Sequence, residues 1–257
     1  MSDAITSAQA PDDFWVTKNP NLKIGRGFGW SAKAKPLSGP HVRLSLAILV
    51  YVLVQVGVIS VILGSFYLFS QIDAGANLDT PMIVAMAQYI GIAGQFLPIV
   101  AGVTMIICVI VYSLFVYRAM NNLHLSNARE ATITPGMAVG WSFIPFANLG
   151  MIYNVMKQIW VASHDPDKGS YSPPITLPLW WGGWITSSIL GRISDSTIGS
   201  RLENADPSEF MSIYTVPAIL GVVAGAISLV SCFLLLRTIK QVTTAQENLR
   251  SIATFNE

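Results

Sequence analysis

Three long apolar stretches dominate the pattern of this chain: residues 44–69, 96–117 and 216–236. None of them contains a charged side chain. A helix of about 20 apolar residues is long enough to cross the roughly 30 Å hydrocarbon layer of a bilayer. Before the second stretch, Pro81 can begin a separate short helix, and Pro98 lies in the first turn of the span that begins at Phe96. A fourth stretch, 177–193, is shorter and has three tryptophans at one end, where a membrane interface favours them. The pattern predicts an all-α integral membrane protein.

The segment that begins at Thr134 has a different, broken pattern. Thr134 can cap a helix that starts with Pro135, and Pro145 then interrupts it, followed by Asn148. A helix over 135–147 would be only about 20 Å long at 1.5 Å per residue, too short to cross. We expect the Asn148 amide to satisfy carbonyl groups freed by Pro145.

Past this break, apolar residues recur at helical spacing up to Trp160. Tyr153, Met156 and Ile159 belong to this apolar face, and Lys157 and Gln158 lie on the opposite, polar face. Such a helix suits a membrane surface.

Two topologies compete for this region. Residues 134–153 cross the bilayer in a five-span arrangement, or they enter and return in a four-span arrangement. With four spans, 13 of the 15 lysines and arginines fall on the cytoplasmic side; with five spans, 10 do. Because cytoplasmic loops are enriched in these residues, we favour four transmembrane helices plus a proline-broken re-entrant or interfacial helical hairpin, with both termini cytoplasmic.

Composition agrees with a membrane location. Hydrophobic residues make up 52% of the chain and charged residues 11%, against about 25% in soluble domains. The net charge of +1 gives no reason to expect a nucleic-acid partner. The two cysteines, Cys108 and Cys232, both lie in apolar stretches and suit neither a disulfide scaffold nor a zinc site.

The chain divides into a polar, basic cytoplasmic tail over 1–42, a membrane domain over 43–240 and a cytoplasmic tail over 241–257. We expect the helix of the last span to continue over 237–250. Basic and aromatic residues alternate in the first tail, which is either disordered or lies on anionic lipid or a partner. Small residues in the spans allow helices to approach closely. These are Gly57, Ser60 and Gly64 in the first span and Gly221, Gly225 and Ser228 in the last. We expect packing within one chain rather than dimerisation.

Residues suited to catalysis are scarce. The predicted spans hold no Asp, Glu, Lys or His at depth, and no nucleophile or metal pattern is visible, so we expect no enzyme, cofactor or metal. An enzyme would need polar groups to converge at the cytoplasmic interface. The candidates for that are Arg118, Asn121, His124, Lys157 and His164.

The run from Thr134 to Leu149, preceded by Arg118 and followed by Tyr153 and Trp160, resembles a bacterial membrane-domain family of unknown function, number 4328. The resemblance covers about residues 45–240. Phe146 stands here for a usual aliphatic residue, and Ile152 stands where a proline often occurs. The resemblance implies a bacterial cytoplasmic (inner) membrane location, but no reaction, ligand or cofactor.

We interpret the chain as a non-enzymatic scaffold or accessory subunit of a larger membrane assembly, in contact with lipid and other membrane proteins. A channel or carrier for a neutral or lipidic solute, lined by Gln55, Trp141 and Asn148, is the alternative. The candidate structural or interaction residues are Arg118, Pro135, Gly136, Trp141, Pro145, Asn148, Tyr153 and Trp160.

Overall fold

The computed structural model describes residues 28–77, 79–144, 146–167, 171–203, 205–206 and 209–255, with the side chains of 197–203 and 254–255 excepted. Every regular element in these ranges is helical, as the sequence predicts. The four long helices are α1 (Ser38–Asp73), α2 (Pro81–Leu125), α5 (Thr176–Glu203) and α6 (Phe210–Phe255). The short elements are α3 (Pro135–Gly140), the 3-10 turn η2 (Trp141–Phe143) and α4 (Ala147–His164).

These elements form two compact units. Unit 2 consists of Leu37–Phe115 and Pro173–Thr244, and so contains α1, α5 and most of α2 and α6. Unit 1 consists of Met1–Pro36, Val116–Ser172 and Ala245–Glu257, and contains α3, η2, α4 and the C-terminal ends of α2 and α6. Unit 2 therefore holds the apolar stretches of the long helices, and unit 1 holds the broken element between α2 and α5.

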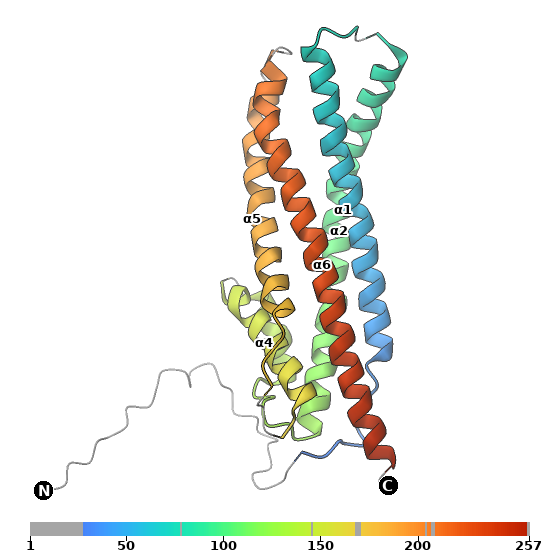
Figure 1. The fold of residues 1–257 in the computed structure, drawn as a ribbon, viewed down its shortest axis with the longest axis vertical. Helices are drawn as coiled ribbons and strands as arrows, with labels where there is room; N and C mark the ends of the chain where they lie inside the picture. The colour runs from blue at the N-terminus through green and yellow to red at the C-terminus, as the bar shows by residue number, and fades with distance from the viewer. Residues whose placement is uncertain are drawn as a thin grey trace, which may run out of the picture. The chain divides into compact units, whose positions relative to one another are not determined.

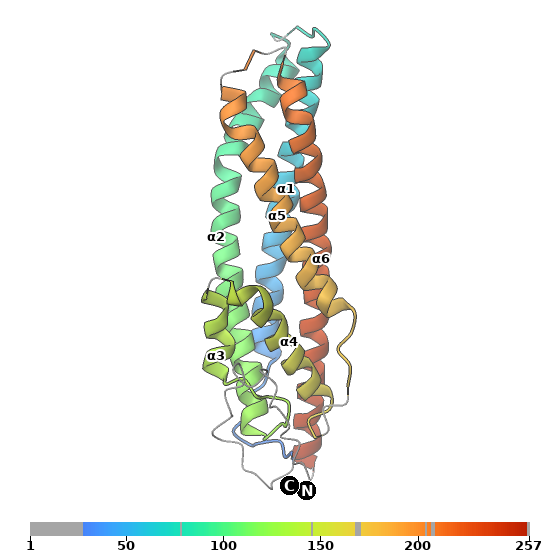
Figure 2. The same cartoon turned by 90° about the vertical axis from the view of Figure 1, so that its left-hand side faces the viewer.

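Small residues bring the helices of unit 2 together, as the sequence predicts. A Cβ atom added to Gly57 of α1 would lie 3.3 Å from the Leu97 side chain of α2. One added to Gly225 of α6 would lie 2.7 Å from the Ile59 side chain of α1. The glycine pair of the last span thus packs within the chain, which confirms that expectation, and α1 runs beside both helices (Figures 1 and 2).

Helix α5 packs on α6 in the same way. A Cβ atom on Gly183 would collide with the Ser231 hydroxyl, and the Ser194 hydroxyl donates to the Pro217 carbonyl oxygen at 2.9 Å. Trp180 and Trp181, which the sequence predicts in an interfacial belt, are buried inside unit 2, and their depth in the membrane stays a prediction. The Trp180 ring lies against Tyr112 of α2, with ring centroids 6.2 Å apart, so it packs between two helices of this unit.

Helix α2 is longer than the sequence indicates. A short helix from Pro81 and a separate span from Phe96 were expected, with Pro98 in the first turn of that span, but one 45-residue helix covers both. Pro98 therefore lies in the helix interior, where its missing N–H leaves the Gly94 carbonyl without its usual partner. The apolar residues on both sides keep the helix continuous, because an isolated helix end in lipid would expose more unsatisfied groups.

Three helices, α1, α2 and α6, are long and apolar enough to cross a membrane, so the chain is a multi-pass membrane protein in contact with lipid. Large apolar side chains such as Leu53, Ile99 and Phe233 are exposed along them, as lipid-facing residues should be. Helix α5 has 28 residues but is less apolar, owing to its glycines and polar residues.

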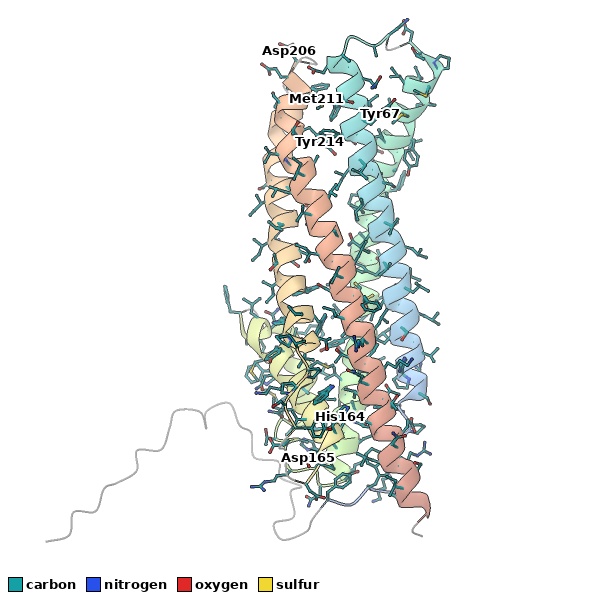
Figure 3. The ribbon with its side chains drawn as sticks, in the orientation of Figure 1. Tyr67, His164, Asp165, Asp206, Met211 and Tyr214 are labelled. Carbon is teal, nitrogen blue, oxygen red and sulfur yellow. The ribbon has the colours of Figure 1, made fainter. Side chains whose placement is uncertain are left out.

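The C-terminal end of α6 confirms a further prediction. The sequence indicates that the last span continues as a helix over 237–250, and α6 runs without interruption to Phe255. Tyr214 near the other end of α6 stacks edge-on against Phe69 of α1, with ring centroids 5.0 Å apart. Figure 3 shows Tyr214 and Met211 on α6 beside Tyr67 of α1.

Candidate functional site

The broken element of unit 1 begins as the sequence predicts. Thr134 adopts an extended backbone conformation, and its hydroxyl oxygen accepts a hydrogen bond from the Met137 N–H at 3.4 Å. Pro135 follows as the first residue of α3, where its missing N–H costs nothing. Helix α3 ends at Gly140 and passes into η2, and the chain then turns into α4 (Figure 2).

The turn between η2 and α4 exposes apolar side chains. Phe143, Ile144, Phe146 and Leu149 are all exposed, and Phe146 reaches 87%. We call these four residues the apolar tip. Phe146 has φ of 64°, a conformation that costs a bulky residue on the order of 1–3 kcal/mol. Backbone strain that holds an aromatic ring in the open is a feature expected at a functional surface.

The other predicted residues of the broken element lie around this turn. Trp141, Asn148 and Tyr153 are half-buried, and Gly136 is exposed. Pro145 lies outside the described residues. The Asn148 backbone N–H donates to the Ile144 carbonyl oxygen at 3.1 Å. The role expected for its side-chain amide stays a prediction.

Arg118 and Trp160 lie farther along unit 1, each with its own partner. The Arg118 guanidinium donates to the Pro36 carbonyl oxygen at 3.4 Å. Trp160 is buried and stacks on His164, with ring centroids 4.0 Å apart. His164 and Asp165 mark the end of α4 (Figure 3). The apolar face of α4 from Val155 onwards is buried inside unit 1, so these turns are not free to lie on lipid.

A buried polar network holds unit 1 together. The Gln246 side chain of α6 is 1% exposed, and its Nε2 atom donates to the Ala119 carbonyl oxygen at 3.3 Å and to the Ser163 hydroxyl at 3.0 Å. Its Oε1 atom accepts from the Asn122 amide at 3.2 Å. Polar groups buried this deeply are stable only when they are paired, so this network fixes α2, α4 and α6 to one another.

The same amide of Asn122 holds residues 28–36, which we call the N-terminal strap. Asn122 Nδ2 donates to the Lys35 carbonyl oxygen at 2.8 Å, and Asn122 Oδ1 accepts from the Lys35 N–H at 2.9 Å. At the other end of the strap, the Gly29 N–H donates to the Ser126 carbonyl oxygen and the Phe28 N–H donates to Asp167. This part of the predicted N-terminal tail therefore packs on the protein itself.

Two further side chains satisfy the loop before α3. His124 is buried, and its Nε2–H donates to the Ile133 carbonyl oxygen at 2.7 Å. The Ile133 N–H donates to Gln158 Oε1 of α4 at 3.2 Å. Gln158, placed by its spacing on the polar face of α4, is in fact directed into the protein by this hydrogen bond.

The polar residues proposed for an enzyme take different partners. Arg118 bonds the strap, His124 bonds the loop, and His164 stacks on Trp160, while Lys157 is exposed. No group of three or more metal-ligating side chains occurs among the described residues. The arrangement in unit 1 is therefore one of backbone satisfaction and packing.

Sequence reasoning missed the network residues Asn122, Ser163 and Gln246. In the sequence, Gln246 follows the last predicted span, and a polar residue at such a position is expected to face solvent. Its partners lie more than 80 residues away in the chain, so no local pattern could reveal them.

The comparisons with known proteins bear on the same region. A family described as a domain of unknown function (DUF4328) matches residues 79–241, well over half of the chain. The match includes the whole of α2, the broken element and α5, and it ends just beyond the last span. No curated protein and no solved structure is significantly similar to the chain.

Proposed function

Since the chain belongs to the DUF4328 family, we propose that it is a non-enzymatic scaffold or accessory subunit of a bacterial inner-membrane assembly. The observation that carries this proposal is the apolar tip, in which Phe146 is 87% exposed on a strained backbone. The network of unit 1 fixes α4, the helix that follows the tip, to α2 and α6, and a rigid support reduces the entropy lost when a partner binds.

The proposed topology has four spans, with the apolar tip entering the membrane from the cytosolic side. Helix α3 is about 9 Å long, which is too short to cross the membrane. The 3-10 turn η2 follows it, so the α-helix does not continue. Helix α5 is about 42 Å long and packs along α6, which supports it as the fourth span despite its lower apolarity. Irregular backbone at membrane depth must find its hydrogen-bond partners in protein. A neighbouring subunit at the tip would bury this backbone away from lipid.

Site-specific photocrosslinking in native membranes tests the proposal. A photoreactive phenylalanine analogue at Phe146 should give a discrete protein adduct. The matched control is Phe96, an aromatic residue of α2 that is also well exposed but lies on the apolar surface of a span. The proposal fails if Phe146 crosslinks to lipid alone, or if Phe96 yields the same protein adduct.

A substitution separates contact from folding. Phe146→Asn removes the apolar ring while asparagine tolerates positive φ, so the fold should be retained and the partner lost from gentle detergent extracts. If the partner still co-purifies with this variant, the tip is not the contact.

The channel alternative depends on the amide of Asn148. Transport of a neutral solute would require this half-buried group to contact the solute. Solute flux into liposomes that contain the purified protein, abolished by Asn148→Leu, would favour a channel or carrier over the scaffold.

A further inference from the structure

The charges of unit 2 are separated by position. Every carboxylate of this unit lies in residues 73–79 or 195–209, which include the end of α1, the last turns of α5 and the connections that follow these two helices. At the opposite end, Arg43 directly precedes the apolar stretch of α1, and Arg237 directly follows that of α6, with Lys240 one turn later. Unit 2 therefore has one end with basic side chains and no acidic residue.

The packing of α1 on α6 brings these basic residues together. Gly225 faces Ile59 and Gly221 faces Ile62, so the two helices run antiparallel in a fixed register. Continuing that register along α1 places Arg43 at the level of Lys240. Both views show α1 and α6 side by side (Figures 1 and 2). Burial and the positive charge of Lys240 lower the pKa of His41, which agrees with this pairing.

Nothing in the described part of the protein neutralises this cluster. Arg43, Arg237 and Lys240 are exposed, and none of them forms an ion pair with a described carboxylate. Like charges gathered in this way repel one another, and an anion placed between them removes that repulsion. Because the cluster lies where the apolar stretches end, it is at the depth of lipid headgroups.

We propose that His41, Arg43, Arg237 and Lys240 form a binding site for the phosphate of an anionic phospholipid. The acyl chains would lie against the exposed apolar side chains that adjoin the cluster, such as Leu46 of α1 and Phe233 of α6. The site is on unit 2 alone, and it does not depend on the apolar tip or on its partner.

The test measures lipid binding to the purified full-length protein by native mass spectrometry. Phosphatidylglycerol should bind more tightly than phosphatidylcholine with the same acyl chains. Arg237→Gln should weaken phosphatidylglycerol binding about fivefold, the equivalent of about 1 kcal/mol for one basic residue at an anionic surface. The triple variant of Arg43, Arg237 and Lys240 to glutamine should bind both lipids alike.

Two controls keep the result specific. Arg192→Gln removes one exposed positive charge from α5 and should leave the lipid preference unchanged. The conservative variant Arg237→Lys keeps the charge and should retain it, which separates a charge effect from a folding defect.

Three results would overturn the site. The first is equal binding of the two lipids to the native protein. The second is an equal loss in Arg192→Gln and Arg237→Gln. The third is displacement of phosphatidylglycerol by inorganic phosphate at equal concentration, which would make the cluster a site for a free anion.

Discussion

Replacing Asn122 by aspartate changes one atom group in the network of unit 1 and should loosen the N-terminal strap. Asn122 is 1% exposed, and its Nδ2 atom donates both to the Lys35 carbonyl oxygen and to Gln246 Oε1. In Asn122→Asp the side chain keeps its shape, but an oxygen replaces this donor and faces two acceptors. The Lys35 carbonyl is only partly buried and its lost hydrogen bond costs about 1 kcal/mol, whereas the buried Gln246 Oε1 left unpaired costs about 1–3 kcal/mol, so the variant loses about 2–4 kcal/mol. Ionisation of the buried carboxyl adds to this cost.

Hydrogen–deuterium exchange measured by mass spectrometry reads this loss directly. The strap amides of Asn122→Asp should exchange about 30- to 1000-fold faster than in the native protein, since each 1.4 kcal/mol is a factor of ten. The control is Asn121→Asp, the same change at the neighbouring, half-buried position, whose side chain is not a member of the set of contacts that joins Lys35, Asn122 and Gln246. Its exchange should change less than about threefold, because surface substitutions cost about 0.5 kcal/mol at most. Equal exchange in the two variants, or unchanged exchange in Asn122→Asp, would refute the role given to the network.

Three further predictions concern packing, backbone and topology. Gly225→Val should lower stability in detergent by about 1–3 kcal/mol, because its Cβ would lie 2.7 Å from the Ile59 side chain, whereas Gly102→Val points into open space and should not. Thermal unfolding compares the two, and equal midpoints would contradict the close approach of α1 and α6. Asn127 has φ of 59°, a conformation that alanine adopts less readily than glycine, so Asn127→Ala should be about 1 kcal/mol less stable than Asn127→Gly. Equal unfolding midpoints of the two variants would contradict this backbone effect. In a cysteine-free background, a single cysteine at exposed Arg129 should react with an impermeant reagent only after permeabilisation, and one at exposed Asp206 should react in intact cells; the reverse pattern would invert the topology.

The sequence predicted helices α1, α6 and the start of α3, but it did not predict the length of α2. The long apolar stretches predicted α1 and α6 because hydrocarbon requires about 20 apolar residues, a local property of the chain. The cap at Thr134 and the start of α3 at Pro135 were also local, and both are confirmed. The merging of two predicted helices into α2 was missed, since Pro98 normally marks a helix end and only surrounding lipid and helices favour continuity there.

For the site, the sequence indicated the broken element but not what supports it. Phe146 was noted only as a departure from the family pattern, while its exposure and its positive φ belong to the folded turn. The tryptophans of α5 were assigned to an interface because tryptophan favours one, whereas the burial of Trp180 and Trp181 and the contact of Trp180 with Tyr112 of α2 belong to the packed helices.

The length of each apolar stretch, the helix caps and the positions of lysine and arginine can thus be read directly from the sequence, because each is a property of residues close together in the chain. They were sufficient to identify a multi-pass helical membrane protein. The tertiary structure alone decided which polar residues are buried, because Gln246, Ser163 and Asn122 meet only after segments more than 80 residues apart have packed together. A hydrogen bond between such distant groups leaves no periodic trace in the sequence, since its partner is chosen by the packing of helices and not by spacing along one of them.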